Sequence, residues 1–384
     1  MRIVILAHEL YVSGGISVGK NIVATLPKIA PQHQYLITIP PGLAYERHDE
    51  KKNVSVIEIK PMNRLRKILH LLRILPKITE RFNPDVIVGL ANQGLFKPSC
   101  RQVILFHRAQ LVYHLKNDMR NLYGYKARCK YLLLKTGLRK CLGHTQIVFC
   151  QTPVIKERFA KTFNFPSQQI KLMPNAVSKF VKEPRKHTTK PQIFENDKYF
   201  NLFFLTQYHP HKNLEILIDI FRTFRKDLDD VRCIITIGAE QHKQAPKLLK
   251  DIEKYGLQEH VINVGPLEQK ELAAYFYHSG ALFFPSLLES FSATYLEAMH
   301  FGLPILTSDL DFARYVCGDT AVYFDPWDTE DVVEKILLLK NTPPLQKELV
   351  QKGKIRVSTF YKNWGSILGD VTNELELLVN QQAE

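Results

Sequence analysis

Short apolar runs alternate with amphipathic stretches along most of the chain. The runs are rich in β-branched and aromatic residues, as in strands, and the stretches between them repeat their apolar positions at helical spacing. In the first half we expect strands at residues 2–7, 35–39, 54–59, 85–90, 103–106 and 146–150. In the second half we expect them at 202–205, 233–237, 261–264, 281–284, 304–307 and 321–324. Strands separated by helices predict parallel sheets in an α/β fold.

A polar, proline-containing passage interrupts the alternation at residues 178–198. It has no sustained apolar period, which is typical of a linker between domains. We therefore expect two Rossmann-like, doubly wound domains, at residues 1–180 and 181–364. Their strands should end at a central cleft.

The two halves differ in charge. Residues 1–180 carry 29 Lys and Arg against nine Asp and Glu, a net charge of +20, and residues 181–384 carry 23 against 29, a net charge of −6. Such an asymmetry predicts that the first domain meets an anionic surface.

The spacing of the cysteines and the lengths of the apolar runs argue against several other classes of protein. The six cysteines form no C-x-x-C pair or ligand cluster, so we expect neither zinc nor disulfides. No apolar run reaches the length that spans a bilayer, and the first strand is too short for a secretory signal. We expect a cytoplasmic protein, free or peripheral on the inner face of the cytoplasmic membrane.

A glycine-rich stretch follows the first predicted strand. Gly14, Gly19 and Lys20 have the spacing of an ATPase phosphate loop, but six residues separate the strand from Gly14, and Asn21 replaces the hydroxyl residue that holds magnesium. We therefore reject ATP hydrolysis. Gly14-Gly15 is either a tight turn without a ligand or a close approach of backbone to an anion before a helix.

Two glutamates in the second half are candidates for a site. Glu289 and Glu297 are separated by seven residues. Both carboxylates can address one cleft if Glu289 lies on the loop before a helix that carries Glu297. Glutamates at this spacing are more often solvated, but apolar residues 298–299 and the turn at 302–304 place Glu297 beside a buried element.

With their neighbours, these glutamates resemble the E-x7-E signature of retaining glycosyltransferases of the GT-B fold, of group 1 or family 4-like type. The other matching stretches are Phe106-His107, Gln151-Thr152-Pro153, Met173-Pro174-Asn175, His211-Lys212-Asn213, Val264-Gly265-Pro266 and residues 319–326. The resemblance covers most of the chain, and the order and spacing of these stretches are specific as a set. It implies that the C-terminal helix, residues 365–384, crosses back to pack on the first domain.

The resemblance also implies the roles of single residues. Lys212 would neutralise the leaving diphosphate, helped by backbone amides and without a metal. The amides belong to Gly14, Gly15, Phe291, Ser292, Ala293 and Thr294. Glu297 would bind ribose hydroxyls, Glu289 the hydroxyls of the donor sugar, and His107 the donor sugar and the acceptor side. Retention would follow front-face attack, although the sequence leaves Glu289 open as a nucleophile.

Several positions depart from the family pattern. Thr206-Gln207-Tyr208 stands where the family has Gly-Arg, and a neutral histidine at 209 or 211 does not replace a bidentate guanidinium. Ser292 replaces the glycine after Phe291, and Tyr315 replaces a glutamate. Asp309-Leu310-Asp311 resembles the D-x-D motif of metal-dependent transferases, yet it follows a strand of the second domain, and we expect no metal.

Two segments of the first domain are strongly basic. Residues 60–82 hold seven Lys and Arg against one acid, and residues 116–140 hold eight against one. On a helix from about residue 63, a stripe of bases lies beside an apolar face, and Pro76 should kink or end this helix. The stripe is Arg66, His70, Arg73 and Lys77, and the face is Leu65, Ile68, Leu69, Leu72 and Leu75. Such helices suit an anionic membrane surface, or are core-facing helices with a solvated back. No nucleic-acid motif accompanies the bases, so we expect no nucleic acid as a partner.

Together these features predict a retaining, metal-independent hexosyltransferase of polysaccharide or lipopolysaccharide biosynthesis. Its donor would be a nucleotide sugar such as a UDP- or GDP-sugar, and its acceptor a lipid-linked or membrane-proximal glycan. Two alternatives stay open. A non-hydrolysing sugar-nucleotide epimerase shares the architecture, and a non-catalytic, membrane-associated partner of a transferase would keep the basic face.

Overall fold

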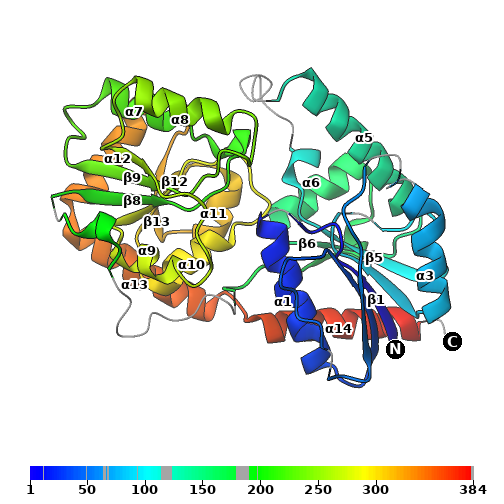
Figure 1. The fold of residues 1–384 in the computed structure, drawn as a ribbon. Coiled ribbons are helices and arrows are strands. Elements are labelled where there is room, and N and C mark those ends of the chain that lie inside the picture. The colour runs from blue at the N-terminus through cyan, green and yellow to red at the C-terminus, as the bar shows by residue number, and fades with distance from the viewer. Residues whose placement is uncertain are drawn as a thin grey trace. The chain divides into compact units, whose positions relative to one another are not determined.

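The chain folds into two compact units (Figure 1). A computed structural model describes all residues except 12, 49, 64–65, 67–68, 93, 114–122, 179–189, 197 and 382–384. Unit 1 consists of Met1–Ala176 and Lys362–Glu384, and unit 2 is Val177–Tyr361. Each unit is a parallel sheet with helices on its faces, which confirms the predicted fold class. Most of the expected linker lies outside the described residues, but Gln192–Phe194 form a 3-10 turn.

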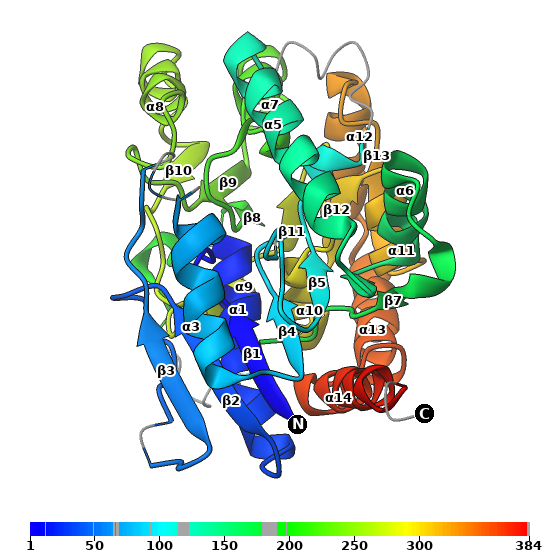
Figure 2. The same cartoon turned by 90° about the vertical axis from the view of Figure 1, so that its right-hand side faces the viewer.

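Unit 1 contains a seven-stranded sheet in the order β3-β2-β1-β4-β5-β6-β7 (Figure 2). Its strands are β1 (Arg2–Leu6), β2 (Gln34–Ile39), β3 (Val54–Glu58), β4 (Val86–Gly89), β5 (Arg101–Phe106), β6 (Ile147–Cys150) and β7 (Ile170–Leu172). The strand order reverses between β1 and β4. Six of these strands are predicted from the sequence; β7, three residues long, is too short to show a period.

Helices cover both faces of this sheet because successive side chains of a strand point to opposite sides. Ile3 and Ile5 of β1 share a core with helix α1 (Ser13–Ile29) and with the C-terminal helix α14 (Trp364–Asn380). Val4 and Leu6 pack on the other side. The C-terminal helix therefore belongs to unit 1, as the resemblance implied. The remaining helices of unit 1 are α3 (Leu75–Phe82), α5 (Tyr125–Leu142) and α6 (Pro153–Phe163).

The helix expected from about residue 63 does not end at Pro76. A π-helical turn, His70–Ile74, precedes α3, and the Leu75 N–H donates to the His70 carbonyl five residues back. Pro76 then lies in the first turn of α3, where a residue without an N–H is tolerated. The wide turn shifts the faces of the helix: His70, expected in the basic stripe, is buried, while Leu69 and Leu72 are exposed. Leu65 and Ile68 lie outside the described residues.

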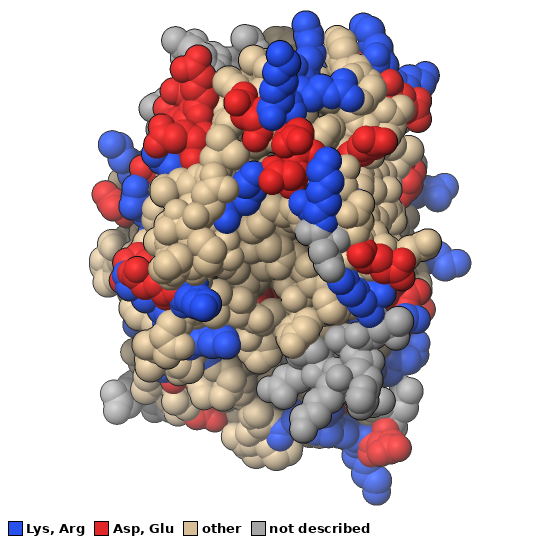
Figure 3. Space-filling view, turned by 90° about the vertical axis from the view of Figure 1, so that its left-hand side faces the viewer, with Lys and Arg blue, Asp and Glu red and all other residues tan. Residues whose placement is uncertain are grey.

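Unit 2 contains a six-stranded sheet in the order β10-β9-β8-β11-β12-β13. Its strands are β8 (Phe200–Phe204), β9 (Val231–Ile235), β10 (Val261–Asn263), β11 (Ala281–Phe284), β12 (Ile305–Ser308) and β13 (Ala321–Phe324). Its helices are α7 (Ile216–Thr223), α8 (Ala245–Lys254), α9 (Leu272–His278), α10 (Ala293–Phe301), α11 (Asp311–Cys317), α12 (Thr329–Asn341) and α13 (Pro343–Thr359). The strands are buried on both faces in one large core. Acidic and basic side chains are interspersed on the face seen in Figure 3.

Candidate functional site

The strand order of unit 2 reverses between β8 and β11, and the candidate residues of this unit follow these two strands. Ligands of open α/β sheets bind at such a reversal, beyond the carboxyl ends of the strands. The loop after β8 carries Lys212, and the loop after β11 carries Glu289. The two loops are joined where the Leu287 N–H donates to the His211 carbonyl at 2.8 Å.

Lys212 and Glu289 form an ion pair. The Lys212 Nζ lies 2.5 Å from the Glu289 Oε1, and the two side chains are only 15% and 13% exposed. The ammonium also lies 4.7 Å from the centroid of the Phe284 ring. A half-desolvated cation beside an aromatic ring interacts more strongly with anions than a surface lysine does.

The start of α10 lies on the same loop as Glu289. Ser292 is the N-cap residue, and its side chain makes no capping hydrogen bond. The first N–H groups of a helix lack partners within the helix, so the start of α10 can favour an anion. Phe291 is buried, with its ring centroid 5.9 Å from that of Tyr361 in an edge-to-face arrangement. Phe291 thus anchors the loop by its side chain.

Glu297 lies on α10 and is 7% exposed. Within the described part of the chain its carboxyl makes no hydrogen bond or ion pair, and burial raises its pKa to about 7. An acid in this state can either donate or accept a hydrogen bond near neutral pH. Such a group suits a hydroxyl ligand, which also does both.

The two glycines of unit 1 lie in the first turn of α1, which begins at Ser13, and so they do not precede the helix as expected. Gly19 and Lys20 lie further along α1, so this stretch is no P-loop. A Cβ on Gly15 would lie 3.8 Å from the His107 Nε2 and 3.2 Å from Leu10. The structure thus brings Gly15 and His107 together, and space is limited at Gly15.

His107 directly follows β5, and its backbone N–H donates to the Asn92 Oδ1 at 2.6 Å. Burial, and secondarily Arg108, lower its pKa to about 4. The imidazole is therefore neutral at physiological pH. A neutral imidazole can hydrogen-bond a sugar hydroxyl without attracting a counter-ion.

Sequence reasoning missed two further polar residues that follow strands of the unit 1 sheet. His8 follows β1, is buried and makes a 2.8 Å hydrogen bond between its Nδ1 and the Thr38 Oγ1. Its ring lies 6.0 Å from that of His70. Arg108 lies two residues after β5, and burial lowers its pKa despite the nearby Tyr131 and Glu9. The available signal was a polar residue one or two positions after a buried strand.

The D-x-D sequence of unit 2 is used within the fold. Asp309 accepts two hydrogen bonds from Arg314, at 2.6 and 2.7 Å, in a bidentate pair. The Asp311 Oδ1 accepts the Phe312 N–H at the start of α11. Among the described residues, no three His, Cys, Asp or Glu side chains are grouped so as to hold a metal ion.

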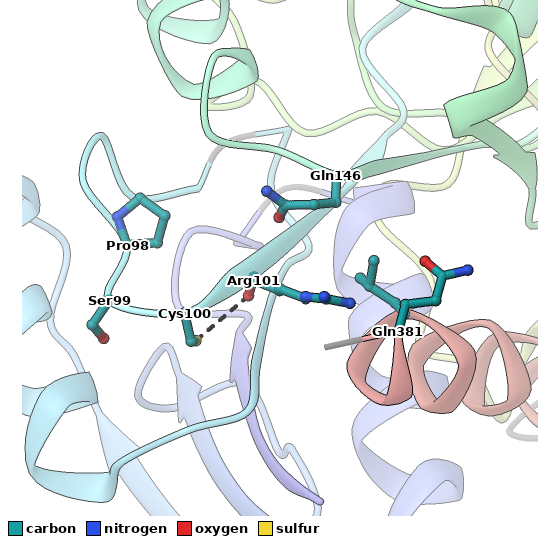
Figure 4. A pocket seen from close by; sticks show the side chains of 7 residues that line it. Pro98, Ser99, Cys100, Arg101, Gln146 and Gln381 are labelled. Carbon is teal, nitrogen blue, oxygen red and sulfur yellow. Dashed lines mark hydrogen bonds between the residues drawn. The ribbon is translucent and has the colours of Figure 1, made fainter. Parts of the chain in front are cut away.

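A hollow of about 490 Å³ lies at the opposite edge of the unit 1 sheet. Figure 4 shows it between the loop that leads into β5 and the end of α14, with Arg101, Gln146 and Gln381 in its wall. The amino edge of a parallel sheet is not where ligands of this fold class bind. We do not assign this hollow to the candidate site.

The basic segments carry exposed apolar residues. Leu69, Leu72 and Ile74 are exposed beside the exposed Arg66 and Arg73. The same holds for α5, where exposed Tyr125, Leu132 and Leu133 accompany Lys and Arg with no acid within the helix. Residues 116–122 of the second basic segment lie outside the described residues. Among the helices of the described chain, none has the length and apolarity to cross a membrane.

The candidate residues of unit 2 lie in a segment that matches a known protein family. Residues 185–356 match the model of the family described as glycosyl transferases group 1. This segment is most of unit 2, and through it the chain is similar to that family.

One curated relative is the O-antigen chain mannosyltransferase RfbU of Salmonella typhimurium, which is 25% identical over 214 residues. The match covers 55% of this chain and 54% of RfbU, so the chain spans about half the length of this relative.

Two solved structures share the whole fold. WaaG, a glycosyltransferase involved in lipopolysaccharide biosynthesis, superposes with a TM-score of 0.72 at 14% identity, covering 97% of this chain and 99% of WaaG. Anabaena Alr3699/HepE in complex with UDP and glucose has a TM-score of 0.71 at 13% identity, covering 98% and 99% of the two chains. This likeness confirms the predicted GT-B fold.

Proposed function

We propose that this protein is a retaining glycosyltransferase that moves a sugar from a nucleotide-sugar donor to a glycan acceptor. The observation that carries the proposal is the Lys212–Glu289 ion pair, at 2.5 Å, with Glu289 on the loop that leads into α10 at the strand reversal of unit 2. It lies within the segment that matches the transferase family. Support for a nucleotide donor comes from HepE, which binds UDP.

In this proposal the two members of the ion pair contact different parts of the donor: Lys212 contacts the diphosphate and Glu289 contacts the sugar. The leaving group is a nucleoside diphosphate, which gains negative charge as the bond to the sugar breaks. Lys212 and the N–H groups of Ala293 and Thr294 neutralise that charge, and in this proposal they take the place of a metal. The carboxylate of Glu289 accepts hydrogen bonds from sugar hydroxyls and favours positive charge at the anomeric carbon. Glu297 binds the ribose hydroxyls.

Transfer with retention follows from attack on the same face as the leaving group. The acceptor hydroxyl bonds to the anomeric carbon as the bond from that carbon to the diphosphate oxygen breaks. The hydroxyl proton passes to the departing phosphate oxygen, so no enzymic base is needed. In unit 1, the backbone amides of Gly14 and Gly15 would help to neutralise the diphosphate, and His107 would contact the donor sugar and the acceptor.

The acceptor in this proposal is a lipid-linked or membrane-proximal glycan of the polysaccharide or lipopolysaccharide type. RfbU is named for O-antigen chains and WaaG for lipopolysaccharide biosynthesis, which supports this class. Within residues 60–82, the exposed leucines supply apolar contacts and the Lys and Arg residues supply cationic contacts for an anionic membrane surface. The protein would then work peripherally on the inner face of the cytoplasmic membrane.

The test is removal of each member of the ion pair. We expect Lys212→Ala and Glu289→Ala each to lower the rate of transfer by about 10²–10³-fold, the usual loss when one transition-state contact is removed. The rate is read as release of UDP or GDP from a nucleotide sugar in the presence of a lipid-linked glycan extract. Glu289→Gln, which keeps the shape of the side chain, should behave as Glu289→Ala does.

The matched control is a surface ion pair of the same unit. Lys270 and Glu268 lie 2.7 Å apart, with side chains 78% and 69% exposed. Lys270→Ala and Glu268→Ala should leave transfer unchanged. Wild-type rates in Lys212→Ala or Glu289→Ala would overturn the site. Turnover of donor without any acceptor would indicate the epimerase, and absence of nucleotide-sugar binding would indicate the non-catalytic partner.

A further inference from the structure

The loop that carries Lys212 also carries two stacked histidines. The rings of His209 and His211 lie 5.4 Å apart with an interplanar angle of 15°. They flank Pro210 in a 3-10 turn, Pro210–Lys212, in which the Lys212 N–H donates to the His209 carbonyl at 2.9 Å. The two imidazoles are therefore held beside the ammonium group that we assign to the diphosphate.

Hydrogen bonds from other parts of unit 2 fix this loop at its start. The Thr206 N–H donates to the Thr236 Oγ1 at 3.0 Å, and the Thr236 hydroxyl donates back to the Thr206 carbonyl at 2.8 Å. The Tyr208 N–H donates to the Gln241 Oε1 at 2.9 Å. The chain therefore enters the histidine turn in one orientation.

The end of the loop is also fixed. Asn213 adopts a left-handed conformation, with φ at 56°, and its side-chain amide donates to the Pro326 carbonyl at 3.1 Å. His211 is only 8% exposed, and its carbonyl accepts the Leu287 N–H. The fold thus fixes the backbone on both sides of the two rings.

Of the two imidazoles, that of His209 is the better placed to change its protonation state. It is partly exposed, and its imidazole makes no hydrogen bond within the described part of the chain. Burial, then Lys212 and His242, lower its pKa to about 4. Burial, then Lys212 and His209, hold the pKa of His211 well below its usual value. At neutral pH both rings are therefore neutral when no ligand is bound.

The neighbouring charges are nearly balanced. Lys212 is paired with Glu289, and Glu215 accepts a hydrogen bond from the Tyr208 hydroxyl. The His242 ring stacks on Tyr208 at 5.2 Å, and burial, then Lys243, lower its pKa. A diphosphate placed against Lys212 adds negative charge next to His209. One unit charge about 4 Å away, at an effective dielectric constant of about 20, raises the proton affinity of an imidazole about a thousandfold.

We propose that His209 takes up a proton when the nucleotide sugar binds and thereby supplies the second cation that the diphosphate needs, with His211 as a stacking support. The proposal rests on the proposed function and names the group that stands in for the arginine absent at Gln207. Each donor bound carries one proton from solvent onto His209, and its release returns that proton. Donor affinity then rises as the pH falls, by at most about tenfold per pH unit.

Calorimetric titration at pH 7 with UDP-glucose and GDP-mannose tests this proposal. Their diphosphates are diesters that do not titrate near neutral pH, so any proton exchanged belongs to the protein. In two buffers of different ionisation enthalpy, the wild-type protein should show binding enthalpies that differ in the sense of proton uptake. In a Glu297→Gln background, which removes the other group of the site that titrates near pH 7, His209→Gln should abolish the difference and weaken binding roughly tenfold. In the same background, His209→Arg should abolish the difference yet keep the affinity.

Two further variants locate the proton. His211→Phe keeps an aromatic partner for His209 and should keep the uptake, whereas its loss there would contradict the assignment to His209. His242→Gln removes the other nearby imidazole and should also keep the uptake. Wild-type binding with equal enthalpies in the two buffers, or unchanged uptake in His209→Gln, overturns this inference alone. If neither nucleotide sugar binds the wild-type protein, the proposed function fails with it.

Discussion

The two units have the same type of fold but carry different side chains at the carboxyl edges of their sheets. Unit 2 places two carboxyl groups and a lysine there, and its surface mixes acids and bases (Figure 3). Unit 1 places histidines there, among them His8 and His107, and its outer helices combine bases with exposed leucines. In the function that we propose, this difference suits unit 2 to a small charged ligand and unit 1 to an extended anionic surface.

The largest expected effect on the contrast between the two units comes from a substitution in the core of unit 1. Leu375 of α14 is fully buried against α1, whereas Leu377 of the same helix is 60% exposed. Leu375→Ala should destabilise unit 1 by about 2–5 kcal/mol through lost burial and a cavity. Hydrogen exchange, read separately for the two units, should show reduced protection in unit 1.

Leu377→Ala is the matched control and should change stability by less than about 0.5 kcal/mol. Equal effects of the two substitutions, or an equal loss of protection in unit 2, would contradict the assignment of α14 to unit 1.

The second prediction concerns the acid that unit 2 buries. Because the pKa of Glu297 is raised to about 7, the folded state holds its proton over a pH range in which the unfolded state has lost it. The contribution of this proton to stability is present at about pH 4 and is lost as the pH rises through about 7. Glu297→Gln should therefore stabilise the protein by about 3 kcal/mol at pH 8 and have no effect at pH 4.

Urea unfolding at the two pH values measures this difference. Glu334→Gln, at a side chain that is 71% exposed, should show no such dependence. A constant difference between wild type and Glu297→Gln at both pH values would show that this carboxyl does not titrate in the predicted range.

The smallest effect for each residue changed is expected for vesicle binding, which compares the basic surface of unit 1 with the mixed surface of unit 2. Neutralising Arg66, Arg73 and Lys77 of unit 1 together should weaken binding to anionic vesicles by about 1 kcal/mol for each cation removed. Co-sedimentation with vesicles of mixed zwitterionic and anionic lipid measures the loss.

The control makes the same change of charge in unit 2. Lys247, Lys250 and Lys254 are exposed on α8, and replacing all three by Gln should leave vesicle binding unchanged. Equal losses in the two triple variants would mean that net charge, and not the surface of unit 1, attracts the membrane.

The order of strands and helices could be predicted from the sequence because buried parallel strands are continuous apolar runs. Positions that depend on backbone detail could not. The start of α1 lies before Gly14, although glycine disfavours helix, and the π-turn before Pro76 reversed the expected exposure of His70 and Leu69. Such shifts depend on packing against the sheet, which no local pattern encodes.

The candidate site shows the same division. Lys212, Glu289 and Glu297 could be singled out by motif, and the strand reversal explains why the first two lie together. Their direct ion pair could not be predicted, because it depends on side-chain conformations in two separate loops. The stacking of His209 on His211 could not be predicted either, because it depends on side-chain conformations within one loop.

The position of α14 has a consequence for synthesis of the protein. The chain leaves unit 1 after Ala176, builds all of unit 2, and returns to unit 1 only at Lys362. On the ribosome, unit 2 is therefore complete before the segment that covers α1 has emerged. Until then, the apolar side of α1 that packs against Trp364 and Leu375 in the folded protein is exposed to water and accessible to chaperones. The unit made first is thus the unit finished last.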